Sequence, residues 1–264
     1  MLLEVCVDTV LSARNAAEGG CDRIELCSSL KHGGLTPSSG VLQTVAAMLR
    51  KRASDGLKKV CLMAMVRPRP GDFTYDDEEV RSMLLDVEGA ARDGADGVVF
   101  GALTSDGKVD EGVCRLLLQK CDELGLDVTF HRAFDFVHDA NEALDTLSAL
   151  GIPRVLTSGG RSNAFEGLVG IRNLLERSAG GGLQVKVMAG GGINASNVKD
   201  FVSALGDGYD GLLEVHGSFK TTVTTRAGYS WRADPDKTEF GQWWASGLEN
   251  VRAASGAIST NTAQ

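Results

Sequence analysis

His131, Arg132 and Asp135 place an imidazole, a guanidinium and a carboxylate within five consecutive residues of the chain. They follow the apolar, β-prone run 128–130, so a buried strand is predicted to end where these groups begin. Ligand sites of α/β proteins lie at the carboxyl ends of the strands. We therefore predict His131 as a catalytic acid, with Arg132 and Asp135 beside it. A core histidine hydrogen-bonded to a neighbouring carbonyl is the alternative.

Four more polar residues are expected on the same rim, because alternate residues of a strand share one face. Glu25 lies on the second predicted strand, and Arg67 ends the third. Glu214 and His216 share one face of the last strand. We predict that Glu25 or Glu214 acts as a general base, that Arg67 and Arg132 clamp an anion, and that His216 joins the site. A buried network of purely structural ion pairs is the alternative.

Sulfur-containing side chains are also expected inside this rim. Cys6 and Cys27 fall at equivalent ends of neighbouring predicted strands, and Met63 and Met65 lie one strand further along. Soft sulfur ligands select Cu(I), so Cys6 and Cys27 form a candidate metal site. The alternative is that these side chains only fill the core, where cysteine and methionine are common. The six cysteines lack a Cys-x-x-Cys pair, and we expect reduced thiols.

Two glycine-rich turns could hold an anion. Ser158 and Gly159 follow the sixth predicted strand, and Gly190, Gly191 and Gly192 follow the seventh. Backbone amides near a helix N-terminus bind phosphate, and barrels often do so after strands seven and eight. The same glycines are what any tight strand-to-helix turn requires, so a structural role remains open.

Strand-like and helix-like segments alternate along most of the chain. Strands are predicted at 2–7, 23–27, 59–67, 97–103, 127–131, 154–158, 184–189 and 211–216, with helices at 9–19, 39–53, 76–93, 111–124, 139–150, 165–178 and 196–205. Strict alternation favours a parallel sheet, because parallel neighbours need crossover helices. Eight such units predict a single-domain α/β protein, a (β/α)8 TIM barrel, with an open doubly wound sheet as the alternative.

The last part of the chain differs from the rest. We assign residues 1–228 to the barrel and 229–264 to a C-terminal extension. Trp231, Trp243 and Trp244 are all in this extension. A final helix is predicted over 242–254, and the small polar residues after it predict a frayed end.

Composition excludes several classes of partner. The 264 residues are 43% hydrophobic and 23% charged, and the net charge is -8. An acidic chain without a basic cluster argues against nucleic acid. No apolar run reaches the ~20 residues of a membrane span, so no membrane partner is expected. Met1 leads directly into a strand-like run without a basic leader, which predicts a cytoplasmic protein.

Motifs along most of the chain are similar to those of the copper homeostasis protein CutC family. The matching stretches run from residue 3 to about 218, and they are Leu3-Glu4-Val5-Cys6, Asp22 to Ser28, Gly33 to Ser38, Arg67-Pro68-Arg69, Gly71-Asp72-Phe73, Gly94 to Gly101, Thr129 to Asp135, Leu156 to Gly159 and Glu214-Val215-His216. One departure is Pro70, where the family tends to have glycine.

The resemblance implies a TIM barrel, a cytoplasmic location, a role in copper homeostasis and a homo-oligomer. It also implies that Cys6 and Cys27 match the cysteines suspected of holding Cu(I). Two functions are thus expected to compete. One is a protein that binds copper ion as Cu(I) without chemistry, and the other is an enzyme with acid/base chemistry on a small anionic or phosphorylated metabolite. The fold cannot decide between them, because barrels host many functions.

Overall fold

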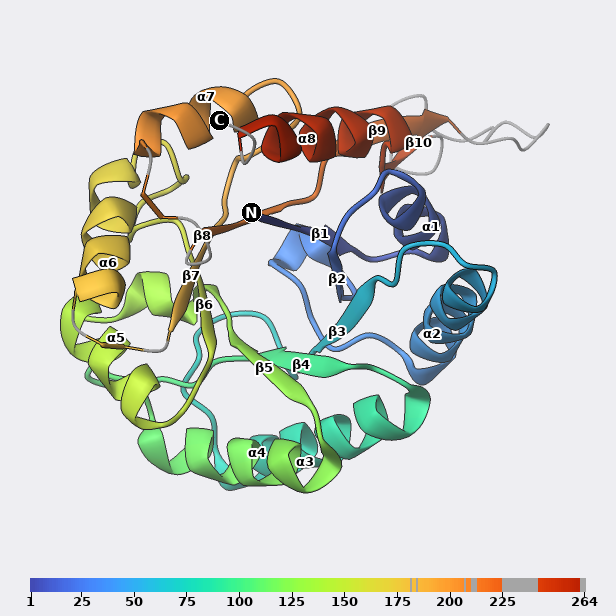
Figure 1. Ribbon diagram of the computed structural model, residues 1–264. Helices are drawn as coiled ribbons and strands as arrows, with labels where there is room; N and C mark the ends of the chain where they lie inside the picture. The colour runs from blue at the N-terminus through green and yellow to red at the C-terminus, as the bar shows by residue number, and fades with distance from the viewer. Residues whose placement is uncertain (181, 184, 207, 210–212, 225–241, 262–264) are drawn as a thin grey trace, which may run out of the picture.

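The computed structural model describes residues 1–264 apart from 181, 184, 207, 210–212, 225–241 and 262–264. Eight parallel strands close into a barrel in chain order, with β8 paired to β1 (Figure 1). The predicted (β/α)8 TIM barrel is confirmed. The strands are β1 (Leu2–Val7), β2 (Arg23–Leu26), β3 (Cys61–Met65), β4 (Gly97–Phe100), β5 (Asp127–Phe130), β6 (Arg154–Thr157), β7 (Lys186–Ala189) and β8 (Leu213–Gly217).

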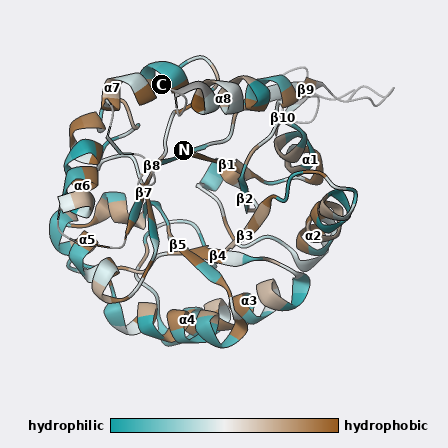
Figure 2. Ribbon diagram, viewed as in Figure 1, coloured by the Kyte–Doolittle hydropathy of each residue, from teal (hydrophilic) through white to brown (hydrophobic). Residues whose placement is uncertain are grey.

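Helices surround the strands in a ring (Figure 1). They are α1 (Val10–Glu18), α2 (Ser39–Ser54), α3 (Asp77–Asp93), α4 (Glu111–Leu124), α5 (Ala140–Ala149), α6 (Leu168–Gly180), α7 (Val198–Leu205) and α8 (Leu248–Asn261), with short 3-10 turns η1 (Leu30–His32) and η2 (Arg132–Phe136). Brown and teal alternate along these helices in Figure 2, as expected when one face packs on the barrel.

Local sequence explains where the helices begin. The carboxylate of Asp76 accepts the Glu79 amide, while the Glu79 side chain accepts the Asp76 amide, so a capping box starts α3. Thr9 caps α1 in the predicted place. Most predicted bounds agree to within a few residues. Two predicted strands, 184–189 and 211–216, begin on residues outside the described part of the chain.

The predicted final helix over 242–254 is wrong in position. Gln242–Ser246 is a strand, β10, which pairs antiparallel with β9 (Lys220–Thr224). The β-prone pair Trp243 and Trp244 explains this strand, because aromatic residues favour a pleated ribbon. Backbone groups of Ser246 bind the side chains of Ser12 and Asn15, at 3.1 and 2.8 Å, and so fix the ribbon to α1.

The helix that follows, α8, packs against α7, α1 and β1 and fills the last place in the ring (Figure 1). Its Val251, Ala254 and Ile258 belong to the main core. The chain therefore remains helical well past Ala254, where a frayed end was predicted, and residues 262–264 lie outside the description. The predicted boundary between residues 228 and 229 and the position of Trp231 also lie outside it.

A close contact between the end of α1 and α8 allows a prediction of how much stability the packing of α8 contributes. A Cβ on Gly19 would lie 2.5 Å from the fully buried Val251. Val251→Ala should lower the free energy of unfolding by roughly 2 kcal/mol, because two buried methyl groups are lost. Urea denaturation measures this loss.

The exposed neighbour Glu249, whose side chain is 79% exposed, provides the control. Glu249→Ala should change the same free energy by less than about 0.5 kcal/mol. Equal losses in both variants would show that α8 is not held by its Val251 face.

Candidate functional site

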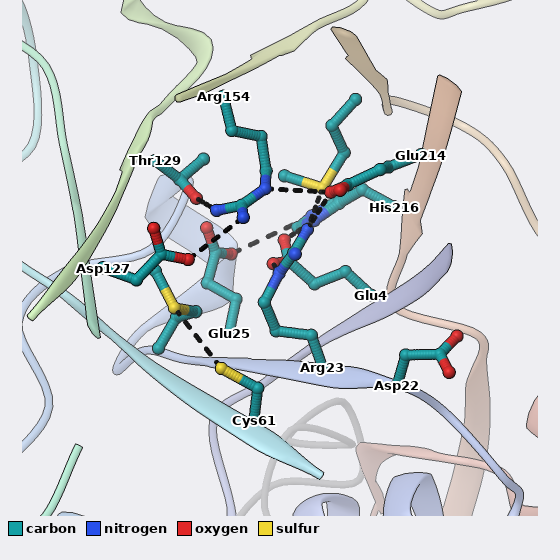
Figure 3. Close-up of polar contacts among 12 residues, drawn as sticks. Glu4, Asp22, Arg23, Glu25, Cys61, Asp127, Thr129, Arg154, Glu214 and His216 are labelled. Carbon is teal, nitrogen blue, oxygen red and sulfur yellow. Dashed lines mark hydrogen bonds and ion pairs between the residues drawn. The ribbon is translucent and has the colours of Figure 1, made fainter. Parts of the chain in front are cut away.

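A buried ion network fills the barrel interior near the N-terminal ends of the strands, which we call the lower part of the barrel (Figure 3). Arg23 bridges Glu4 and Glu214, and all three side chains are at most 4% exposed. Arg154 lies 2.9 Å from the same Glu214 oxygen and donates to Thr129 Oγ1 at 2.8 Å. Burial alone would raise the pKa of Glu4, but the Arg23 charge and the His216 hydrogen bond hold it at about 2. Glu214, one of the two residues predicted as a general base, is therefore paired with two arginines in this buried network.

Above this network, Cys6, Glu25 and His216 converge. One donor atom from each lies within 4.8 Å of the other two. The register explains the meeting, because Cys6 pairs with Glu25 across β1 and β2, and Glu4 pairs with His216 across β1 and β8. The predicted grouping of Glu25 with His216 on one face is therefore observed.

The orientation of His216 is set from below by Glu4. His216 Nδ1 lies 2.7 Å from Glu4 Oε1, and Nε2 faces Glu25 at 3.9 Å. An ionised carboxylate on Nδ1 keeps the proton there and directs the other nitrogen toward Cys6 and Glu25. Burial lowers the pKa of His216, but Cys6, Glu25 and Glu4 outweigh it and raise the value well above the usual range.

Cys27 lies beside this cluster, directly after the end of β2. The Cys27 thiol donates to Glu25 Oε2 at 3.5 Å, and Cys27 is buried. Burial, followed by the Glu25 charge, raises the pKa of this thiol well above its ordinary value. Cys6 and Cys27 therefore do not face each other directly, because barrel strands are staggered and Cys6 is level with Glu25. Met63 and Met65 pack beside Cys27, as predicted for the third strand.

His131 lies on the other side of the mouth. Its Nδ1 accepts the Ala133 amide at 3.2 Å, and its ring packs 5.0 Å from Phe73. Burial lowers the pKa of His131 to about 3, and the Arg67 charge adds to the effect. The imidazole is therefore neutral at pH 7 and presents an N–H at Nε2. Within the described residues this buried Nε2 has no hydrogen-bond partner, and neither has Glu25 Oε1.

The two arginines of the rim have different roles. Arg67 donates to the carbonyls of His32, Gly34 and Gly71, at 3.0 to 3.2 Å. It is a buried cation with no carboxylate ion pair in the part of the chain that the structure describes. Arg132 instead pairs with Asp135 at 2.7 Å and donates to Ser158 Oγ.

Asp135 connects η2 to the turn after β6 through hydrogen bonds. Its carboxylate accepts from Thr157 Oγ1, from Ser158 and from the Gly160 amide, at 2.5 to 3.1 Å. The Gly159 amide is likewise taken by Thr157 Oγ1. An external anion at Ser158 and Gly159 would have to compete with this carboxylate.

Three adjoining cavities open at the mouth, with Cys6, Ser218 and Lys220 in the wall of each. The first, of about 630 Å³, includes Gly191, Gly192 and Arg132. The second, of about 170 Å³, is central and is lined by Glu25, Arg67, Phe73, His131 and His216, among others. The third, of about 690 Å³, lies under Trp243 and Trp244. Gly190 is in none of these walls, and its amide binds the Thr157 carbonyl at 2.9 Å.

The comparisons with known proteins agree with this architecture. A family model described as the CutC family matches residues 1–221. The human copper homeostasis protein cutC homolog is 48% identical over 84% of this chain and 74% of its own length. A family protein CutC of Vibrio campbellii is 44% identical over 83% of this chain and 82% of its own. The chain belongs to the CutC family.

A solved structure points to the same family. The putative copper homeostasis protein CutC of Streptococcus agalactiae superposes with a TM-score of 0.72 at 31% identity, covering 83% of this chain and 98% of that one. Thiamine phosphate pyrophosphorylase of Pyrococcus furiosus is 13% identical, with a TM-score of 0.56 and coverage of 98% of this chain and 96% of that one. The second likeness shows the barrel fold alone. Among the described helices of this CutC-family chain, none is long and apolar enough to cross a bilayer.

Several lining residues were missed by sequence reasoning. Arg154 was placed on a strand without a role, although the parity of 154 and 156 would have directed it into the barrel. Phe73 and Lys220 lie outside the strands of the barrel, so parity gives no signal for them. Phe73 was noted only as part of the Gly71-Asp72-Phe73 motif that resembles the family.

Glu25 predicts how stability depends on pH. Burial, together with the Glu4 charge, raises the pKa of Glu25 to about 7, and His216 offsets only part of this. Because the folded state holds the proton more tightly than the unfolded chain, stability should fall as pH rises from about 4.5 to 7 and then level off. The free energy of unfolding of the parent protein should fall by roughly 3 kcal/mol between pH 4.5 and pH 8. Glu25→Gln, which cannot titrate, should not show this fall.

Unfolding free energies of both proteins at the two pH values measure this difference. Glu111→Gln, at a side chain 55% exposed, is the control and should follow the parent protein. A pH slope that is unchanged in Glu25→Gln would contradict the assignment of the buried acid.

Proposed function

We propose that this chain is a copper homeostasis protein that binds Cu(I) at the barrel mouth. The observation that carries the proposal is the convergence of Cys6, Glu25 and His216 within 4.8 Å. Thiolate and imidazole are donors that suit copper, and Glu4 holds the imidazole as metal-binding histidines are usually held. The names of the human and streptococcal relatives, which refer to copper homeostasis, support it.

In this proposal Cys6 and His216 bind the ion, and Cys27 supplies a further sulfur. Cys27 adjoins the cluster through its hydrogen bond to Glu25. Burial raises the pKa of this thiol, and the neighbouring acidic groups raise the pKa of His216. A metal must therefore displace a proton from each, and affinity should increase with pH. Glu25 is a harder ligand, better suited to accept the released proton than to bind Cu(I).

The resemblance to the family also supports a cytoplasmic location and self-association. Both are part of the proposal. Cell fractionation tests the first, and the mass of the purified protein by light scattering tests the second.

Substitutions of the cysteines test the copper site. Under a competing chelator, Cys6→Ser should abolish Cu(I) binding, and Cys27→Ser should weaken it, because thiolates are the soft ligands. Glu4→Gln keeps every ligand but loses the carboxylate behind His216, and it should weaken binding by about 10–100-fold.

Cys61→Ser provides a matched control. Cys61 starts β3 at the opposite end of the barrel interior, near Met63 Sδ. It should leave affinity unchanged. Equal affinity in Cys6→Ser and Cys61→Ser, or tighter binding of Zn²⁺ than of Cu(I) by the parent protein, would contradict the proposal.

We infer a second candidate function from the polar groups that copper does not use. It is acid/base chemistry on a small anionic or phosphorylated metabolite. Supporting it, Glu25 has a pKa of about 7, near the optimum for a general base, and His131 offers an unpaired N–H to the same cavity. Gly191, Gly192, Arg132 and Lys220 line the adjoining cavity, which suits a phosphate group.

Inorganic phosphate is the probe for this anion site. It should raise the thermal stability of the metal-free protein, by about 2.7 kcal/mol at a hundredfold excess over Kd. Lys220→Met should reduce the protection, because an exposed cation of the cavity wall is lost. Lys199→Met, at another exposed lysine, on α7, should not. The same protection in both variants would show a general salt effect instead of a site.

A further inference from the structure

The central cavity contains two buried polar atoms whose hydrogen-bonding needs are opposite. His131 Nε2 and Glu25 Oε1 both lack a partner within the described residues, and both residues line this space of about 170 Å³. A buried polar group without a partner costs about 1–3 kcal/mol, so two in one cavity call for an explanation. A single water needs only about 10–15 Å³ of such volume, so there is room for a small organic molecule.

His131 must present a hydrogen-bond donor. Its Nδ1 accepts from the Ala133 amide, which leaves the proton on Nε2. The ring is held between Gly101 and Phe73. It lies so close to the Gly101 backbone that a Cβ there would be 2.5 Å from Nδ1, and Phe73 packs against the ring. Nε2 is therefore a donor that requires an acceptor atom in the cavity.

Arg67 adds a positive charge to the same wall. Its guanidinium lies 4.9 Å from the centre of the Phe73 ring and is held by three neutral carbonyls. These carbonyls bind the two terminal nitrogens, leave Nε without a partner among the described residues, and do not cancel the charge. In a site of low dielectric, a cation without a counterion favours an anionic ligand. The acceptor beside His131 is thus best supplied by a carboxylate.

Glu25 Oε1 requires the opposite group. Its other oxygen accepts from the Cys27 thiol, and the free oxygen can accept a hydroxyl of the ligand. A small ligand that carries both a carboxylate and a hydroxyl would supply a partner to each of the two atoms.

We propose that the central cavity binds a small hydroxycarboxylate, with its carboxylate against His131 and Arg67 and its hydroxyl donating to Glu25. This inference rests on the second candidate function and names its ligand class. It concerns binding, and copper is not required for it.

Three related probes separate the two contacts. Lactate carries both groups, propionate lacks the hydroxyl, and lactamide lacks the charge. Calorimetry on the reduced, metal-free protein should show lactate binding about 10–100-fold more tightly than either relative. Glu25→Leu should abolish the preference for lactate over propionate. Glu25→Gln keeps an acceptor and should retain the preference, which provides a second variant if Glu25→Leu does not fold.

His131→Phe supplies the other half of the test. It should weaken lactate and propionate by the same factor, because both share the carboxylate. Phosphate protection without any preference for lactate over propionate would overturn the hydroxycarboxylate and leave the anion site standing. Failure of phosphate and of all three probes would overturn both, whereas Cu(I) affinity is measured independently of either.

Discussion

The ion pair network of Arg23 with Glu4 and Glu214 is the constraint on which the mouth of the barrel depends. Arg23 on β2 reaches Glu4 on β1 and Glu214 on β8, so one guanidinium joins three neighbouring strands at the point where the barrel closes (Figure 3). Buried charges are costly unless all are paired, and loss of one partner typically costs 3–5 kcal/mol. The network therefore favours one arrangement of these strands over others.

Glu4 connects this network to the residues of the proposed site above it. Glu4 uses one oxygen for Arg23 and the other for His216. The carboxylate that completes the structural layer thus also sets the orientation of the imidazole above it. Below this level each charge has an oppositely charged partner. Above it, His131 Nε2 and Glu25 Oε1 lack a hydrogen-bond partner among the described residues, and Arg67 lacks a carboxylate partner, so we place the proposed site in this upper layer.

Sequence reasoning could identify the barrel and most of its inward-facing polar groups, because strand parity depends only on local alternation. It could not supply the stagger between strands, which is a property of barrel closure and places Cys6 level with Glu25. Asp135 shows another limit, because its type and position suggested chemistry, whereas its many donors are visible only in three dimensions. At the C-terminus, two adjacent tryptophans were included in a helix because long-range pairing with β9 is absent from local periodicity.

Copper and a small anion would draw on the same atoms. Cys6, Glu25 and His216 form the proposed metal site, and all three also line the central cavity with His131 and Arg67. A Cu(I) ion on Cys6 and His216 would add a positive charge beside Glu25, and a hydroxyl on Glu25 would hinder proton release to it. Each occupant would therefore alter the affinity for the other by the same factor, as thermodynamic linkage requires. The two functions need not be exclusive, because a single mouth with shared donors can make metal binding sensitive to a metabolite.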